Sequence, residues 1–158
     1  MFYRLSLVVF FFLSFGFLIS PVVFSKDYYY EHEFRGIKPG VSYLNGVNKI
    51  HGTPLDFIDN AKNYISIYSD FRVSTLKPSN VVKTIIIFDE NYKTVSGVSI
   101  GDSYSNLIKT TNFKWIAGRS VVVDFKHGIV FNLRNDKVVN IVLTYYLSDD
   151  KIRINPPG

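Results

Sequence analysis

Three histidines are the first candidates for binding a metal or moving a proton: His32, His51 and His127. His32 lies between Glu31 and Glu33, and a Glu-His-Glu run can bind a metal ion weakly. His51 is expected at the end of a helix and His127 in a turn, and neither has a partner at the spacing of metal ligands. We therefore interpret the histidines as turn and cap residues and predict no bound metal or cofactor.

The carboxylates and serines do not form a catalytic pattern. The acidic pairs Asp56/Asp59 and Asp149/Asp150 lie in segments expected to be loops or tail, where a solvated surface is the simpler interpretation. No serine is surrounded by a Gly-x-Ser-x-Gly elbow. No glycine-rich segment ends in the Gly-Lys-Ser/Thr of a phosphate loop. The sequence therefore predicts a protein that is not an enzyme.

Composition narrows the class of partner. The chain of 158 residues contains no cysteine, which excludes disulfides, thiol chemistry and a lipid-modified N-terminal cysteine. The net charge is +5, but the lysines and arginines are scattered and form no run. Nucleic-acid binding normally needs a clustered basic face, so we predict no nucleic-acid partner. A mildly basic surface remains suited to an acidic protein or to anionic lipid.

The N-terminal segment predicts export. Residues 1–4 carry one arginine, and residues 5–24 contain no charged side chain. With the small residue Ser25 at the expected cleavage point, this is the pattern of a signal peptide over residues 1–25. An uncharged run of 20 residues is also long enough to span a bilayer as an uncleaved N-terminal anchor. In either case we expect an exported protein, periplasmic or secreted, with membrane contact only if residues 5–24 are retained.

A decapeptide that occurs twice is the strongest signal about the elements that position these side chains. Residues 36–45 read GIKPGVSYLN and residues 97–106 read GVSIGDSYSN, 61 residues apart. The glycines predict a turn, and the serines predict helix N-caps because a serine hydroxyl can accept a free N–H of the first helical turn. Chance recurrence around two unrelated helix starts is the alternative to duplication. The residues concerned are Gly36, Gly40, Ser42 and Tyr43 in the first copy and Gly97, Gly101, Ser103 and Tyr104 in the second.

The first decapeptide is followed by the pattern of a short helix and then of strands. Leu44, Val47 and Ile50 lie at helical spacing, and Gly52 and Pro54 mark the end of the helix. Residues 55–62 are expected to form at most one helical turn. Alternating or β-branched runs predict strands over residues 64–68, extended by 71–73, and over residues 81–88 and 92–98.

The second half repeats this order. Leu107, Ile108 and Thr111 are expected on the apolar face of its helix, with Ile108 matching Val47. Strands are predicted over residues 121–125, 129–133 and 137–146. We therefore predict an α+β fold of two tandem units, residues 36–96 and 97–157, after a lead segment at residues 26–35. Each unit is a short helix (or helix pair) followed by an antiparallel β-meander, and the helices pack on one face of the sheet.

The two glycine-serine segments are also the basis of a family resemblance. They read Gly36-Ile37-Lys38-Pro39-Gly40-Val41-Ser42, with His51-Gly52-Thr53-Pro54 at the helix exit, and Gly97-Val98-Ser99-Ile100-Gly101-Asp102-Ser103. Over roughly residues 36–146 the pattern resembles the β-lactamase-inhibitor-protein-like superfamily, which includes the outer-membrane-assembly lipoproteins of the BamE/SmpA type. The resemblance implies small α/β units whose tandem sheets form a concave surface for a protein partner. The chain departs from the lipoprotein type because it has no cysteine to lipidate.

Exposed tyrosines are the remaining functional lead. We predict partner binding by Tyr43, Tyr104, Tyr145 and Tyr146, because tyrosine is amphipathic and frequent at binding hot spots. The alternative is that Tyr43 and Tyr104 pack on the sheet and are structural. The predicted function is an exported, non-enzymatic protein-binding or scaffold module of the cell envelope, whose partner is another envelope or secreted protein. The alternative function is a periplasmic small-ligand or lipid-binding protein with a cavity between sheet and helices.

Overall fold

The computed structural model describes residues 28–29, 32–110, 115–117, 120–124, 127–144 and 146–147. The predicted signal segment at residues 1–25 lies outside these ranges, and so does the chain after residue 147. Within the described ranges, no helix combines the length and the apolar composition that crossing a bilayer requires.

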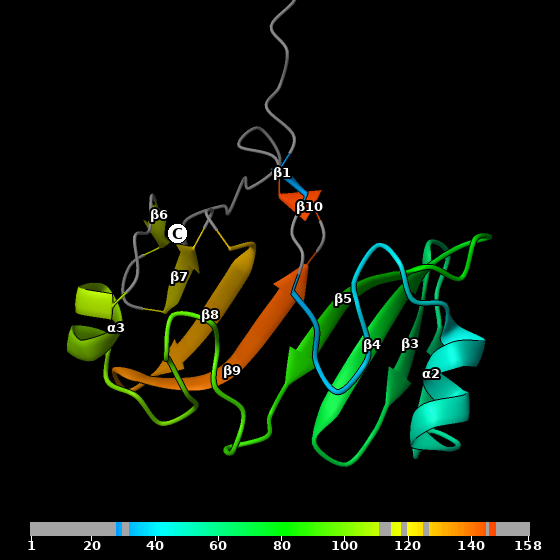
Figure 1. Ribbon diagram of the computed structural model, residues 1–158, viewed down its shortest axis with the longest axis horizontal. Coiled ribbons are helices and arrows are strands. Elements are labelled where there is room, and N and C mark those ends of the chain that lie inside the picture. The colour runs from blue at the N-terminus through cyan, green and yellow to red at the C-terminus, as the bar shows by residue number, and fades with distance from the viewer. Residues whose placement is uncertain are drawn as a thin grey trace, which may run out of the picture.

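Strands dominate the described structure. In chain order they are β1 (Tyr28–Tyr29), β2 (Asp56–Asp59), β3 (Asn63–Ile67), β4 (Phe71–Leu76), β5 (Val82–Ile87), β6 (Trp115–Ala117), β7 (Val121–Asp124), β8 (Ile129–Arg134), β9 (Lys137–Thr144) and β10 (Tyr146–Leu147). Eight of them form one antiparallel sheet in the order β2-β3-β4-β5-β9-β8-β7-β6 (Figure 1). Strands that are consecutive along the chain pair throughout this sheet, except in its middle, where β5 pairs with β9. β1 and β10 form a separate two-stranded ribbon.

Two short helices complete the described elements. They are α2 (Leu44–His51) and α3 (Tyr104–Thr110), and they lie at opposite ends of the sheet, α2 near β3 and α3 near β7 (Figure 1). Each helix buries one aliphatic side chain, Val47 in α2 and Leu107 in α3. Both side chains belong to the core that covers one face of the sheet.

The hydrophobic core lies on one face of the sheet. Burial alternates along β4 and β8 because successive side chains of a strand point to opposite faces. In the middle of the sheet Ile85 pairs with Leu143 and Ile87 with Ile141, and all four side chains are fully buried. Burial of an aliphatic side chain of this size stabilises the fold by about 1.5–3 kcal/mol. These pairs therefore join the first four strands of the sheet to the last four.

The two faces of the sheet are covered differently. Among the described residues, segments outside the strands contribute six buried hydrophobic side chains to the core: Phe34, Ile37, Val47, Tyr68, Val98 and Leu107. The opposite face carries a row of partly buried aliphatic side chains that are not part of this core cluster. The strand registers place Ile67, Ile86, Val142 and Val130 in that row, with the exposed Arg72 of β4 between Ile67 and Ile86, and we call this side of the sheet the open face.

The predicted fold class is wrong. The protein is mostly β, with one continuous antiparallel sheet and two short helices, and it is not built of two tandem helix-plus-meander units with a helical layer. One reason is that β5 and β9 pair directly, which satisfies backbone groups that two separate sheet edges would leave open. The other is helix length. At eight and seven residues, the helices are only about 10–12 Å long and cannot cover the sheet as a layer.

Two predicted elements of the first half are also wrong. Residues 55–62 do not form a helical turn; they contain β2, whose Ile58 pairs with Ile65 of β3. Residues 92–98 do not form a returning strand, because Gly97 N–H donates to Thr94 O at 2.9 Å and closes a turn there. Residues 64–68 and 71–73 belong to two strands, β3 and β4. These elements depend on pairing with segments distant in the sequence, and local periodicity cannot predict such pairing.

Candidate functional site

The turn before α2 is bonded to the beginning of β5 by three backbone hydrogen bonds. Gly40 N–H donates to Val82 O at 2.7 Å, and Val82 N–H donates to Ser42 O at 2.8 Å. Leu44 N–H, the first of the helix, donates to Asn80 O at 3.0 Å. Gly40 has a φ of 79°, a left-handed conformation that glycine adopts without strain. The turn is therefore held at fixed positions against the sheet, and so is the residue before the helix, Tyr43.

The predicted N-cap role of Ser42 is wrong. The N-cap position is Tyr43, in extended conformation with φ −110° and ψ 154°, and no side chain caps this helix end. Ser42 Oγ instead accepts a hydrogen bond from Lys38 N–H at 2.9 Å, within the turn. The physical reason is turn length, because three residues separate Gly40 from the first residue of α2.

The turn before α3 makes the same type of contact with β9 but is one residue shorter. Gly101 N–H donates to Val138 O at 2.8 Å, and Tyr104 N–H, the first of the helix, donates to Asp136 O at 2.8 Å. Only two residues separate Gly101 from α3. The N-cap position is therefore Ser103, whose Oγ accepts a hydrogen bond from the backbone N–H of Asn106 at 3.2 Å.

The one-residue difference gives the two matching tyrosines different environments. Tyr43 precedes its helix and is 54% exposed. Tyr104 is the first residue of its helix, is partly buried and packs against the core. The helices shift in the same way: the buried residue of α3 is Leu107, whereas Ile108, the predicted counterpart of Val47, is 39% exposed. The structure thus separates two tyrosines that the sequence pattern treats as equivalent.

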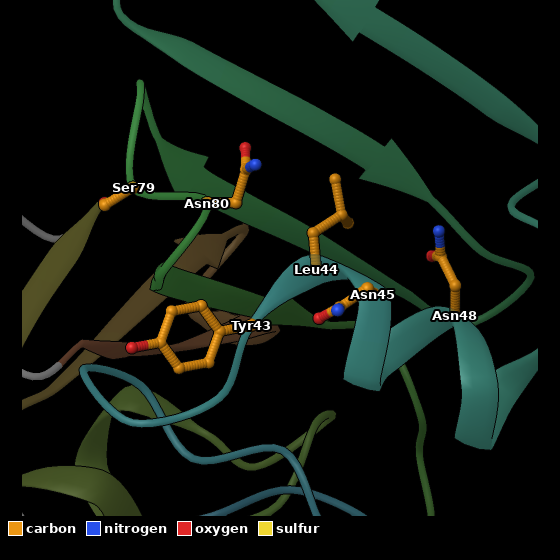
Figure 2. A pocket seen from close by; sticks show the side chains of 6 residues that line it. All are labelled: Tyr43, Leu44, Asn45, Asn48, Ser79 and Asn80. Carbon is orange, nitrogen blue, oxygen red and sulfur yellow. The ribbon is translucent and has the colours of Figure 1, made fainter.

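A groove of about 300 Å³ lies beside Tyr43, between the start of α2 and the loop that leads into β5 (Figure 2). Figure 2 shows the side chains of Leu44, Asn48 and Asn80 projecting to one side of it, with Asn45 directed toward Tyr43. The lining contains neither a carboxylate nor a cationic side chain. The lining residues are Tyr43, Leu44, Asn45, Asn48, Ser79 and Asn80.

The protein itself orients two of the groove's amide side chains. Asn45 Oδ1 accepts a hydrogen bond from Gly46 N–H at 2.8 Å, and Asn48 Oδ1 accepts one from the Tyr68 hydroxyl at 2.7 Å. Burial raises the pKa of Tyr68, so its hydroxyl stays protonated and remains the donor. Both carbonyl oxygens are thus engaged within the protein, and each amide keeps its NH₂ group as a donor. These donors suit the carbonyl oxygens of a partner's backbone.

The other predicted turn and cap residues have structural positions. Gly52 follows α2 with a φ of 80°, and its N–H donates to Asn48 O at 2.8 Å, with the half-buried Pro54 two residues beyond. Gly36 and Gly97 also have positive φ values. Tyr145 lies outside the described residues. Tyr146 pairs in β10 with Tyr29, and the placement of its side chain is not described.

An ion-pair cluster joins three turns that are distant in the sequence. One guanidinium nitrogen of Arg35 lies 2.7 Å from Asp70 Oδ2 and 2.7 Å from Asp89 Oδ2. The pKa of Asp89 is below its usual value, first because Asn91 N–H donates to this carboxylate and then because of Arg35. Arg35 and Asp70 also line a second depression of about 220 Å³. Sequence reasoning missed the cluster because no spacing rule relates these positions.

The structure brings His32 and His127 together, which the sequence did not indicate. Asp124, fully buried at the end of β7, accepts hydrogen bonds from His127 N–H at 3.2 Å and from His127 Nδ1 at 2.8 Å. Burial lowers the pKa of His32 to about 4, with smaller contributions from His127 and Lys38. His51 lies elsewhere and packs edge-on against Phe71. Among the described residues, no group of three or more His, Cys, Asp or Glu side chains could hold a metal ion.

Comparison with known proteins leaves the family open. No protein-family model matches this chain, and no protein with a curated description matches it. One solved structure with some likeness is an extracellular protein containing an SCP domain from Bacillus anthracis str. Ames, with a TM-score of 0.46 and 11% sequence identity over 77% of this chain. The chain spans about half of that protein's length (49%). A likeness at this level establishes neither the fold nor the family, so the resemblance to the β-lactamase-inhibitor-protein-like superfamily stays a prediction.

Proposed function

We propose that this protein is an exported, non-enzymatic binding module that recognises another envelope or secreted protein. The observation that carries the proposal is the groove beside Tyr43. An aromatic side chain that is 54% exposed projects there from a turn that backbone hydrogen bonds hold against β5. Tyrosine provides a large amphipathic contact area at a low cost in conformational entropy. A tyrosine held in this way is therefore suited to act as the anchor of an interface.

The chemistry of the groove favours a protein over a charged or lipidic ligand. Its oriented amide donors on Asn45 and Asn48 match backbone carbonyl oxygens, and Leu44 adds an apolar contact. The neutral lining offers no ion pair to a charged ligand and too little apolar surface for an acyl chain. Among the described residues, no observation favours the small-ligand or lipid-binding alternative.

The open face of the sheet, opposite the core face on which α2 packs, is a second proposed binding surface. Ile86, Val142 and Val130 form a partly buried aliphatic row across β5, β9 and β8 on this face, and the exposed Arg72 of β4 separates it from Ile67 of β3. A stable protein interface buries about 800 Å² on each partner, which the Tyr43 groove alone does not reach. A sheet face with an aliphatic row can supply contact area of this order. Export itself rests on the sequence of residues 1–25.

Site-specific photo-crosslinking in living cells tests the proposal. A photoreactive amino acid replaces Tyr43 in one chain and Val95, which is 72% exposed outside the groove, in the matched control. We expect the Tyr43 position to give one dominant adduct with an exported protein, and the Val95 position to give none above background. Substituting Asn48→Ala in the Tyr43 crosslinker chain should weaken that adduct. Identical adduct patterns from both positions, or adducts only with cytoplasmic proteins, would show the proposal to be wrong.

A further inference from the structure

Strand β2 is an exposed edge of the eight-stranded sheet. All four of its residues are exposed, and among the described strands it pairs only with β3. Leu55, just before the strand, is 76% exposed, and Phe57 and Ile58 within it are 46% and 45% exposed. An exposed edge strand with apolar side chains is a template for pairing with another chain, and natural proteins usually protect such edges.

The direction of the backbone groups in β2 follows from one hydrogen bond and the register. Asn60 N–H donates to Asn63 O at 3.1 Å, and Ile58 pairs with Ile65. In an antiparallel pair, residues that bond to the neighbouring strand alternate with residues that do not. Asn60 and Ile58 therefore direct their N–H and C=O groups toward β3. Phe57 and Asp59 direct theirs toward the free edge.

The N–H group of Phe57, which faces the free edge, is already hydrogen-bonded to a carboxylate. Asp56 Oδ1 accepts a hydrogen bond from this N–H at 2.7 Å. Asp56 has no cationic partner among the described residues, whereas Asp59 forms an ion pair with Lys77. The free carboxylate therefore protects the edge and at the same time marks it with an unneutralised negative charge.

The edge also offers an apolar contact on each face of the strand. Phe57 stacks on Tyr64 of β3, with ring centroids 5.3 Å apart and an angle of 28° between the planes. Ile58 points to the opposite face, because adjacent side chains of a strand alternate. A strand added at this edge could therefore contact Phe57 with one side chain and Ile58 with the next.

We propose that β2 binds an extended segment of a partner protein by strand addition, and that this segment carries a lysine or arginine next to an apolar residue. The cation pairs with Asp56 and draws its carboxylate away from Phe57 N–H, which then joins the backbone ladder with the added strand. Asp56 therefore selects for a basic strand, because a neutral or acidic strand would leave the Phe57 N–H group hydrogen-bonded to the Asp56 carboxylate. This surface is separate from the Tyr43 groove, and the inference does not depend on the proposed function.

A second copy of this chain is a poor occupant of the edge. β2 reads Asp-Phe-Ile-Asp and has no basic residue, so a second copy offers no cation to Asp56 and adds further carboxylates to the same edge. The chain's own residues 151–154 read KIRI, which is a basic and apolar pattern of the required kind. Occupation of β2 by this segment is an outcome that the experiment must separate from binding of a partner.

Peptide titration followed by fluorescence anisotropy tests the inference. The probe is a labelled peptide Thr-Lys-Val-Arg-Val-Thr, and the matched control has glutamate in place of lysine and arginine. We expect the basic peptide to bind the purified protein and the acidic peptide to bind at least about tenfold more weakly. The basic peptide with alternate backbone nitrogens methylated should lose binding, because it cannot complete the ladder. This last control leaves the protein unchanged and so does not depend on how a variant folds.

Two changes in the protein separate the outcomes. Asp56→Asn should weaken binding of the basic peptide about fivefold and narrow its advantage over the acidic peptide, because the charge is removed while an oxygen remains at the cap. A chain that ends after Leu147 should bind the basic peptide as the full chain does. Equal binding of both peptides, or retained binding of the methylated peptide, would overturn the inference. Binding by the shortened chain only would overturn it as well, since the chain's own residues 151–154 would then occupy β2.

Discussion

The turns before α2 and α3 begin with the same residue types but present their tyrosines differently. Each turn donates a glycine N–H and the first helical N–H to the beginning of a long strand, β5 for the first turn and β9 for the second. The first turn contains one more residue, and Val41 within it is 60% exposed. As a result Tyr43 lies before its helix in the groove, whereas Tyr104 lies inside its helix against the core.

The comparison teaches that one inserted residue can change the role of a side chain while the backbone contacts stay the same. The hydroxyl of Ser42 serves the turn, and a carboxylate oxygen of Asp102 does the corresponding work in the second turn by accepting Ser99 N–H at 2.8 Å. Ser103 is then available to cap α3. A matched residue type therefore predicts a matched role only where the count of residues to the helix also matches.

The largest expected effect tests the helix register. Leu107→Ala should lower the free energy of unfolding by about 2–5 kcal/mol, because it removes fully buried methyl groups from the core. Ile108→Ala should cost less than about 1 kcal/mol, because this side chain is partly exposed. Urea denaturation measures both. If the two variants lost equal stability, or if Ile108→Ala lost more, Ile108 would be the buried counterpart of Val47. The proposed difference between the two turns would then be wrong.

The tyrosines provide the next test. Tyr104→Ala should lower the free energy of unfolding by about 1–2 kcal/mol, since the ring packs on the core. Tyr43→Ala should stay within about 0.5 kcal/mol of the unchanged protein, since the ring is mostly solvated. Thermal unfolding of the two variants gives the comparison. A stability loss of the same size at Tyr43 would indicate that its role is structural and would weaken the proposed binding function.

Substitution of Ser103 and Ser42 tests whether each hydroxyl caps a helix or forms a hydrogen bond within the turn. Ser103→Ala should cost about 1 kcal/mol and speed hydrogen exchange at the Asn106 amide, because that N–H loses the hydroxyl acceptor and keeps only Ser103 O at 3.1 Å. Ser42→Ala should speed exchange at the Lys38 amide instead and leave the first turn of α2 unchanged. Site-resolved hydrogen exchange by NMR reads both amides. Faster exchange in the first turn of α2 on removal of the Ser42 hydroxyl would contradict the assignment.

The smallest expected effect concerns pH and the first turn only. Burial holds the pKa of His32 at about 4, with smaller contributions from His127 and from Lys38 of that turn. The counterpart of Lys38 in the second turn is the uncharged Ser99. The unfolded chain has a histidine pKa of about 6.5 and so binds the proton more readily. The free energy of unfolding should therefore fall as the pH drops from about 6.5 toward 4, by less than about 1 kcal/mol because His32 is only partly buried.

Urea denaturation at pH 7.5 and pH 4.5 measures this difference. His32→Gln should reduce the pH dependence relative to the unchanged protein. A full pH dependence in His32→Gln would show that its source is not His32.

Part of the fold was predictable because its causes are local. Runs of β-branched residues predicted strands where β5, β7, β8 and β9 lie, and the glycine turns and the end of α2 at Gly52 also follow from neighbouring residues. The prediction failed at β2, where pairing with β3 overrides a segment without strand alternation. It failed again at residues 92–98, where a turn replaces the expected strand.

The candidate sites divide in the same way. Tyr43 was predictable as an amphipathic residue beside a turn, but its exposure and the burial of Tyr104 depend on residue counts that the pattern hides. The clusters of Arg35 with Asp70 and Asp89, and of Asp124 with His127, have little or no sequence signal, because tertiary contacts create their environments.

The sequence by itself determined part of the local backbone of this protein: the turns at glycine, the end of α2 at Gly52, and the extended runs of β5, β7, β8 and β9. The tertiary structure decided that β5 pairs with β9 in one sheet, that β2 is left as an exposed edge, and that Tyr43 faces the groove while Tyr104 faces the core. The physical reason is range. Backbone preference depends on a few neighbouring residues, whereas strand pairing and exposure depend on how distant segments together bury apolar surface and satisfy their hydrogen bonds.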